Sequence, residues 1–226
     1  MKAETASDRF QPGFDVPRGT IDRLEHYHDL LVKWNKRINL VSPHSISAIW
    51  QRHFADSAQL WPLIPPGAGT LADLGSGAGL PGLVLDCLAR DLSPDLAVTL
   101  IESDARKCAF LHAAIAALGL SARVVNARIE HLRPAVGEEP VPDPATPPVG
   151  PFDVITARAL APLDKLLAYA QPLLAPGGAC LFPKGEGCES ELTRARRHWH
   201  MEIDEHPSQT RAGARILRIT GVARVR

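Results

Sequence analysis

A glycine-rich turn, followed at a fixed spacing by a carboxylate, is the pattern in this chain with the clearest chemical meaning. Residues 71–82 read Leu-Ala-Asp-Leu-Gly-Ser-Gly-Ala-Gly-Leu-Pro-Gly, and a second apolar run at 98–101 ends on Glu102. Glycines let a backbone approach a ligand where a Cβ atom would collide, and the helix start that follows attracts an anionic group. A carboxylate at the next strand's end can accept hydrogen bonds from ribose hydroxyls. The pattern therefore predicts a nucleotide-type pocket.

Two types of nucleotide ligand fit this spacing. Residues 77–82 satisfy GxGxxG and Glu102 follows twenty residues later, which is also the dinucleotide fingerprint. Asp73 argues against NAD, because a carboxylate there would repel a pyrophosphate but would attract an α-ammonium group. The chain also has no room for a separate hydride-transfer domain. S-adenosylmethionine (AdoMet) carries an ammonium group, a ribose and an adenine, so we favour AdoMet over NAD.

Alternating strands and helices must position this pocket. We expect strands at 71–74, 98–101, 123–126, 152–156 and 179–182, and helices at 80–92, 105–118 and 164–174. Such alternation predicts a parallel sheet with helices on both faces. A helix at 189–199 and two strands at 201–206 and 214–222 then predict an antiparallel hairpin at the sheet edge, as at the end of class I methyltransferase sheets. The expected fold class is therefore α/β, a Rossmann-like class I AdoMet-dependent methyltransferase.

Three further regions complete the expected organisation. Residues 1–19 are expected to be flexible, and 67–226 to form the methyltransferase domain. Residues 20–66 are expected to form a helical appendage, with one helix from about residue 20 and a second from Ser45 to Leu60. Residues 134–151 hold seven prolines and two glycines, which predicts a flexible surface loop inserted in the sheet domain.

Composition narrows the class of protein. Formal net charge is zero, so only local basic patches could attract nucleic acid. No apolar run approaches the ~20 residues that span a bilayer, and residues 1–19 lack the apolar stretch of a secretory signal. The four cysteines show no metal-binding spacing. We expect a cytoplasmic monomer with reduced thiols, no metal ion and no membrane contact.

Short segments along the chain match one protein family in its own order. They are residues 31–40, 52–57, 73–82, 100–103, 110–111, 127–130, 157–159 and 183–185. The most specific are Trp-Asn-Lys and Asn-Leu within 31–40, and Arg-His and Asp-Ser within 52–57. In these segments the chain resembles the bacterial 16S ribosomal RNA guanine-N7 methyltransferases, also called the glucose-inhibited division protein B family. Glu102 stands where many members have Asp, and the proline-rich insertion is longer than usual.

The resemblance implies a set of cofactor contacts. AdoMet would contact positions Gly75, Leu80, Ile129, Glu130 and Arg158. Combined with the turn itself, the expected cofactor site comprises Asp73, Gly75, Ser76, Gly77, Gly79, Leu80, Glu102, Ile129, Glu130 and Arg158. Asp73 would meet the ammonium group directly or through water, and Glu102 would hold the ribose. Leu80 and Ile129 would sandwich the adenine, although core packing explains both equally well. From the residues alone, Glu130 is a solvated carboxylate at a helix start.

Four residues are candidates for the substrate side. Arg158 and Lys184 follow predicted strands at the ligand-bearing edge of the sheet. Arginine suits bidentate recognition of phosphate or of the Hoogsteen edge of guanine. The resemblance adds Arg52 and His53 on the second appendage helix, where Asp56 could instead pair with Arg52 four residues away. The candidate catalytic residues are thus Arg158, Lys184, Arg52 and His53.

The function that the resemblance implies is methylation of N7 of a specific guanine in 16S rRNA of the small ribosomal subunit. N7 carries a lone pair and no proton, so catalysis would come from placement rather than from a general base. Candidate RNA-binding cations are Lys33, Lys36, Arg37, Arg123, Arg128, Arg194, Arg196, Arg197, Arg211, Arg215 and Arg218. Two alternatives stay open: a small-molecule or protein methyltransferase, and a noncatalytic AdoMet- or RNA-binding assembly factor.

Overall fold

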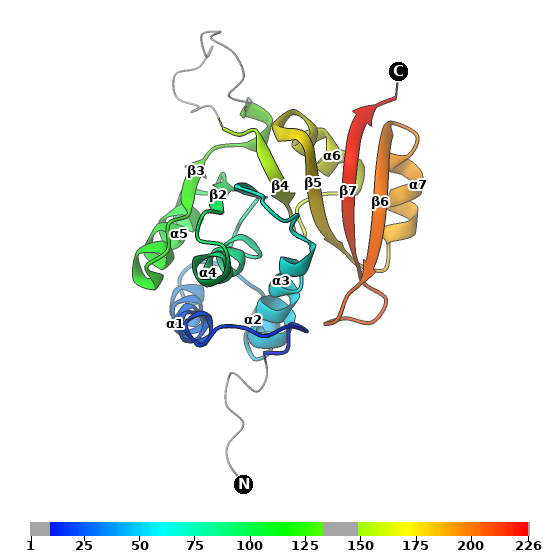
Figure 1. Cartoon of the computed structure of the whole chain (residues 1–226). Helices are drawn as coiled ribbons and strands as arrows, with labels where there is room; N and C mark the ends of the chain where they lie inside the picture. Colours follow the sequence, from blue (N-terminus) through cyan, green and yellow to red (C-terminus); the bar gives the residue numbers. More distant parts are fainter. Residues whose placement is uncertain (1–9, 133–148, 226) are drawn as a thin grey trace, which may run out of the picture.

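A seven-stranded mixed sheet lies at the centre of the computed structural model, which describes residues 10–132 and 149–225 (Figure 1). The strand order is β3-β2-β1-β4-β5-β7-β6. The strands are β1 (Thr70–Leu74), β2 (Ala97–Glu102), β3 (Arg123–Asn126), β4 (Phe152–Thr156), β5 (Leu174–Lys184), β6 (Trp199–Pro207) and β7 (Arg215–Arg224). Strands β1 to β5 are parallel, and β7 runs antiparallel between β5 and β6. The expected Rossmann-like sheet ending in an antiparallel hairpin is confirmed.

The strand order reverses at β1. This strand pairs with β2 on one side and with β4 on the other. In open α/β sheets, ligands bind in the crevice at the carboxyl ends of the strands, at such a reversal. The glycine-rich turn follows β1, Glu102 ends β2, and Arg158 follows β4. The topology therefore brings these three features to one edge of the sheet.

Helices cover both faces of the sheet (Figure 1). One face packs against α1 (Arg18–Asn35), α4 (Gly82–Leu92) and α5 (Ala105–Leu118), and the other packs against α6 (Leu163–Ala170) and α7 (Cys188–Ala195). Because successive side chains of a strand point to opposite faces, Leu71 joins the first core and Ala72 the second. The interior of the domain is thus two apolar layers on either side of one sheet.

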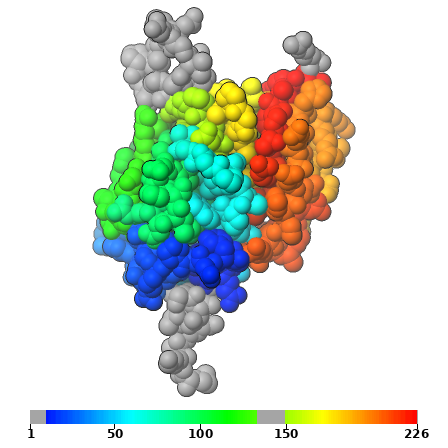
Figure 2. Space-filling model, viewed as in Figure 1, coloured from blue at the N-terminus to red at the C-terminus, as the bar shows by residue number. Residues whose placement is uncertain are grey.

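The second appendage helix is not the single helix expected from Ser45 to Leu60. The chain forms α2 (Pro43–Ile46), the π-helix η2 (Trp50–Ala55), α3 (Asp56–Ala58) and the 3-10 turn η3 (Trp61–Leu63). Trp50 and Phe54 anchor this stretch in the core, with ring centroids 5.1 Å apart. In Figure 2 this cyan segment lies between the green part of the chain, which includes α5, and the orange and red hairpin. Tertiary packing on two sides therefore overrides a continuous α-helix here.

Other boundaries shift by a few residues. Strand β5 begins at Leu174 rather than at 179, because Leu174 pairs with Phe152 across an irregularity in β4. The last helix ends at Ala195 rather than at 199. Trp199 begins β6 instead, with its indole N–H donating to the Asp164 carboxylate at 2.9 Å. Helix α5 spans the expected residues 105–118, with Asp104 accepting the N–H groups of its first turn.

Two segments that the sequence predicts to be flexible lie partly outside the described residues. Residues 1–9 of the expected flexible N-terminus, and 133–148 of the expected proline-rich loop, are not described. Phe10, however, is buried against Trp50 with ring centroids 6.0 Å apart, so its side chain belongs to the core. The division of the chain into domains stays a prediction.

The described residues add three simple findings. All four cysteines are buried and unbridged. None of the helices in this part of the chain is long and apolar enough to cross a membrane. No group of three or more His, Cys, Asp or Glu side chains within it could hold a metal ion.

Tyr27 connects the appendage to the glycine-rich turn. Its ring is fully buried and stacks on Phe54, with centroids 5.1 Å apart. Its hydroxyl donates to the carbonyl of Ala78 in the turn. Burial raises the pKa of Tyr27 well above its ordinary value, so the hydroxyl remains a donor. Through this hydrogen bond, helix α1 fixes the position of the turn.

Replacing Tyr27 with Phe tests this support. The substitution leaves the Ala78 carbonyl buried without its donor, which should lower the free energy of unfolding by about 1–3 kcal/mol in urea denaturation. Tyr169→Phe is the matched control, because that hydroxyl meets Glu130 at an exposed position. An equal loss in the two variants would contradict a special role for the Tyr27 hydroxyl.

Candidate active site

Two adjoining hollows lie at the carboxyl edge of the sheet. The smaller has a volume of about 390 Å³ and the larger of about 890 Å³. Both volumes are in the range of small-molecule sites. The two hollows share one wall, made by Gly75, Gly77, Arg158, Ala159, Leu160 and Ala161. The two hollows are therefore neighbours, separated by residues that line both of them.

The glycine-rich turn forms half of the shared wall. Gly75 and Gly77 have φ angles of +67° and +56°, in the left-handed region that favours glycine. A Cβ atom on Gly75 would lie 2.6 Å from the Leu160 side chain. The turn therefore requires glycine both for its conformation and for the narrow space in front of it.

Glu102 closes the turn from the side of β2. Its Oε2 accepts the N–H of Gly77 at 2.9 Å, and its Oε1 accepts those of Ser103 and Asp104 at 2.7 and 2.8 Å. A carboxylate offers about four acceptor positions, so Oε2 retains capacity for a ligand hydroxyl. The side chain lines the smaller hollow and is held in one orientation. These features fit a ribose, and ribose binding itself stays a prediction.

Asp73 lies beneath the turn and lines neither hollow. It is fully buried, with Oδ2 accepting the N–H of Gly82 at 3.2 Å and Oδ1 accepting the Thr156 hydroxyl at 3.1 Å. Burial raises its pKa to about 6, while these hydrogen bonds oppose the shift. Direct contact with a ligand ammonium group is therefore not available in this structure. Gly79 also lines neither hollow. The absence of a side chain at Gly79 leaves room for the side chains of Leu83 and Tyr27.

The two residues expected to sandwich adenine lie in different hollows. Leu80 lines the larger hollow and packs into the core on the α1 face of the sheet. Ile129 lines the smaller hollow and packs against the core on the α6 face. The structure therefore does not bring these two side chains together in one hollow, and the adenine sandwich stays a prediction. Glu130 does line the smaller hollow, where its Oε1 accepts the Tyr169 hydroxyl at 2.5 Å, a contact that lowers the pKa of Glu130.

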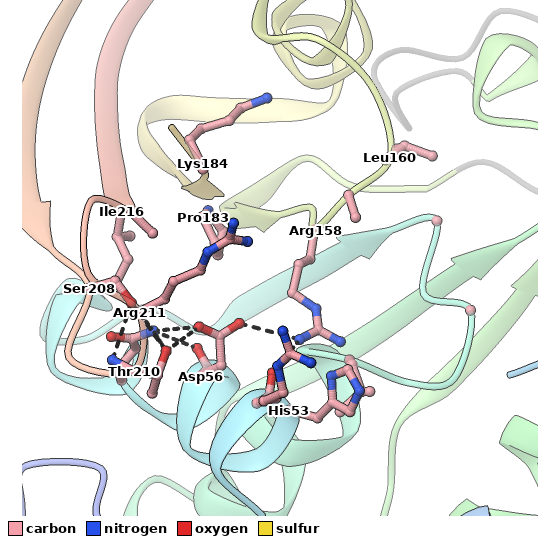
Figure 3. Close-up of a pocket in the computed structure, with 18 of the residues that line it drawn as sticks. His53, Asp56, Arg158, Leu160, Pro183, Lys184, Ser208, Thr210, Arg211 and Ile216 are labelled. Atoms are coloured by element: carbon pink, nitrogen blue, oxygen red, sulfur yellow. Dashed lines mark hydrogen bonds and ion pairs between the residues drawn. The ribbon is translucent and has the colours of Figure 1, made fainter. Parts of the chain in front are cut away.

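Arg158 and the three residues after it form the other half of the shared wall. Figure 3 shows Arg158 beside Asp56 and His53. The Nη1 atom of Arg158 lies 3.3 Å from Oδ2 of Asp56 and 3.3 Å from the carbonyl oxygen of Arg52. The intrahelical pairing of Asp56 with Arg52 is thus wrong, because the Asp56 carboxylate faces across the hollow to β4. Arg52 itself lines the larger hollow and is exposed. Ser76 also lines the larger hollow, and its hydroxyl donates to the backbone carbonyl of Asp73 at 2.9 Å.

Lys184 braces the segment that follows Arg158. Its ammonium group donates to Oε2 of Glu191 at 2.8 Å and to the carbonyl of Ala161 at 3.1 Å. The same Glu191 oxygen accepts the N–H of Leu163 at 2.7 Å. In Figure 3 the Lys184 side chain points away from Asp56 and Arg158. The structure therefore gives Lys184 a supporting position, and its contact with substrate stays a prediction.

His53 lines the larger hollow with both ring nitrogens buried. Neither nitrogen has a hydrogen-bond partner among the described residues. Burial and, to a smaller extent, the nearby Arg158 charge lower the pKa of His53 to about 4. The imidazole is therefore neutral near neutral pH, with one donor and one acceptor that no described residue uses.

The larger hollow has a positive lining. Five cationic side chains line it: Arg52, Arg158, Lys184, Arg211 and Arg215. Two acidic side chains line it: Asp56, which pairs with Arg158, and Glu191, which pairs with Lys184. Arg211 and Arg215 also form ion pairs, with acidic residues outside the lining. Such a surface attracts an anionic partner. The sequence alone did not single out Glu191, Thr210 or Leu160, because no local pattern marks them.

Comparisons with known proteins point to one family. A family model described as rRNA small subunit methyltransferase G matches residues 20–217. A ribosomal RNA small subunit methyltransferase G of Acidiphilium cryptum is 51% identical over 211 residues, covering 92% of this chain and 88% of that protein. One of Paramagnetospirillum magneticum is 47% identical over 211 residues and covers 93% of each chain.

Solved structures share the fold at low sequence identity. A TehB-like SAM-dependent methyltransferase of Corynebacterium glutamicum aligns with a TM-score of 0.54 at 15% identity, over 88% of this chain and 100% of that one. The N-methyltransferase NodS of Bradyrhizobium japonicum, in complex with S-adenosyl-L-homocysteine, aligns with a TM-score of 0.53 at 15% identity, over 86% and 97%. The fold of this chain is therefore that of class I AdoMet-dependent methyltransferases.

The position of Asp73 predicts a pH-dependent stability. Its pKa is about 6 in the folded protein against an ordinary value of 3.8, so between these pH values the native state holds a proton that the unfolded chain has lost. Its contribution to stability therefore falls as the pH rises through this window. The free energy of unfolding of Asp73→Asn, relative to wild type, should rise by about 2 kcal/mol between about pH 4 and about pH 7.

Urea denaturation of both proteins at stepped pH measures this difference. Asp86 is also buried with a pKa raised to about 6, but it is present in both proteins and cancels in the comparison. A difference that does not change with pH would rule out the buried, protonated state of Asp73.

Proposed function

Because the chain belongs to the rRNA small subunit methyltransferase G family and has the fold of AdoMet-dependent methyltransferases, we propose that it transfers the methyl group of AdoMet to N7 of a guanine in the 16S RNA of the small ribosomal subunit. The observation that carries this proposal is the wall shared by the two hollows. A cofactor in the smaller hollow and a base in the larger one would face each other across the glycines and Arg158.

The smaller hollow provides the groups that AdoMet requires. Glu102 would accept ribose hydroxyls, Ile129 and Glu130 would border the adenine, and Gly75 and Gly77 would leave room for the methionine portion. When bound, AdoMet supplies an electrophilic methyl group on a sulfonium sulfur. The protein's part is to hold the two partners in line, an effect that is large when reacting atoms are well oriented.

The polar groups of the larger hollow favour a nucleophile that needs no deprotonation. Its two carboxylates, Asp56 and Glu191, are both committed to ion pairs. His53 is a weak base, because its pKa is lowered to about 4. Guanine N7 has a free lone pair and no proton, so it suits this site better than an amino or hydroxyl group. Neutral His53 and cationic Arg158 are then available to hydrogen-bond the polar edge of the base.

The positive lining supports an RNA substrate. Arg52 and Arg211 line the larger hollow, and Lys33, Lys36 and Arg37 are exposed at the end of α1. Phosphate contacts from such side chains supply much of the affinity in RNA recognition and make it salt-dependent. We include in this proposal that the protein is a cytoplasmic monomer and that its substrate is the small subunit or the free RNA of that subunit.

The identity of the methylated product tests the proposal directly. The protein is incubated with AdoMet labelled in the methyl group and with either small ribosomal subunits or their naked RNA. We expect label in 7-methylguanosine after nuclease digestion. Label in a different nucleoside would exclude N7 as the target, and label only in small metabolites or in protein would exclude an RNA substrate.

Glycine-to-alanine variants test the cofactor wall. Gly75→Ala places a methyl group against Leu160 at the shared wall and should lower methyl transfer by about 100-fold. Gly119→Ala is the matched control, because Gly119 also has a positive φ but lies in open space at the end of α5. Both variants carry the same type of backbone strain. Equal activity of the two would show that the turn does not border the cofactor.

A further inference from the structure

Three segments far apart in the sequence meet at Asp56. This residue lies in α3, between β4 and the loop that joins β6 to β7 (Figure 3). Its Oδ1 accepts the Thr210 hydroxyl at 2.6 Å and the Gln59 amide at 2.9 Å, and its Oδ2 lies 3.3 Å from Arg158. Asp56 and Thr210 are 154 residues apart, so only the folded chain brings them together.

The loop between β6 and β7 is fastened to α3 by several contacts. The Gln59 amide nitrogen lies 3.3 Å from the Ser208 hydroxyl, and the Gln59 carbonyl oxygen accepts the N–H of Gln209 at 2.8 Å. Gln59 is only 4% exposed, so these hydrogen bonds are protected from water. The hairpin loop is thereby a fixed part of the larger hollow, which Ser208, Thr210 and Arg211 also line.

The contact between Asp56 and Arg158 is shielded in the same way. Their side chains are only 20% and 18% exposed. A charge-assisted contact in such a setting is stronger than one at an open surface. The other oxygen of Asp56 is fully used by Thr210 and Gln59, so the carboxylate cannot rotate away from Arg158 without losing both.

We propose that Asp56 is a positioning residue, which holds the Arg158 guanidinium at the wall between the two hollows and connects the hairpin loop of 208–213 to it. This inference rests on the proposed function, since the wall is where methyl transfer would take place. Asp56 itself does not touch the reacting atoms in this scheme. The C-terminal hairpin, whose described residues do not line the smaller hollow, lines the larger one, and this carboxylate connects it to Arg158.

Asp56→Asn disrupts the contact with Arg158 but can keep the contacts with Thr210 and Gln59. The amide oxygen can still accept from Thr210 and Gln59, but an N–H donor then faces the Arg158 guanidinium. We expect kcat/KM for RNA methylation to fall by about 100-fold, because a displacement of about 1 Å at a reacting site has effects of this size. Thr210→Val, which removes a donor from the same carboxylate, should cause a smaller loss in the same direction. Asp164→Asn is the control, since that carboxylate pairs with Trp199 away from both hollows.

A double-mutant cycle with Arg158→Met distinguishes positioning from a general effect on folding. If Asp56 acts through Arg158, adding Asp56→Asn to Arg158→Met should lower kcat/KM by less than about threefold further. A further loss of about 100-fold in that background would overturn the proposal.

An NMR measurement separates this proposal from the proposed function. In ¹⁵N-labelled protein without RNA, the Arg158 Nε–Hε cross-peak should shift or broaden in Asp56→Asn and stay in place in Asp164→Asn. An unchanged cross-peak in Asp56→Asn would overturn the positioning role. If the wild-type protein methylates no RNA, the proposed function fails, and this cross-peak alone decides whether Asp56 positions Arg158.

Discussion

The turn between β1 and α4 depends on polar groups that hold it from outside. Three of its glycines, Gly75, Gly77 and Gly79, adopt left-handed backbone angles, and three backbone groups of the turn are fixed by side chains. Gly82 donates to buried Asp73, Gly77 donates to Glu102, and the Ala78 carbonyl accepts from Tyr27. A buried backbone group left without a partner is costly. These contacts therefore set where the turn lies, and both hollows are built around it.

The second half of the shared wall lies in the segment of residues 158–163, and this segment is held at both of its ends. Asp56 holds Arg158 at one end, and the Lys184–Glu191 pair holds the backbone of Ala161 and Leu163 at the other. Between them, Ala159 has a φ of +52°, which costs about 1–3 kcal/mol for a residue other than glycine. Such strain persists only where the surroundings fix it. A rigid wall of this kind suits a reaction that depends on orientation rather than on proton transfer.

Local patterns predicted much of the architecture. Helix α5 has its expected ends, because Asp104 caps its first turn and Gly119 takes the left-handed position after its last. The glycine turn, Glu102 and Arg158 lie at one sheet edge because the alternation of strands and helices dictates a parallel sheet. The broken appendage helix could not be predicted, since no local pattern marks the π-helix at Trp50–Ala55, whose Trp50 and Phe54 rings pack against Phe10, Tyr27 and His28.

The amino-acid sequence by itself determined the sheet, the turn and the residue types at its edge, because these follow from periodicity and from backbone preferences that neighbouring residues share. The tertiary structure alone decided which polar groups meet. Asp73 lies under the turn rather than in a hollow, Lys184 pairs with Glu191, and Asp56 faces Arg158 instead of Arg52. Hydrogen bonds and ion pairs act over about 3 Å, so a side chain's partner depends on how segments separated by up to 154 residues pack together.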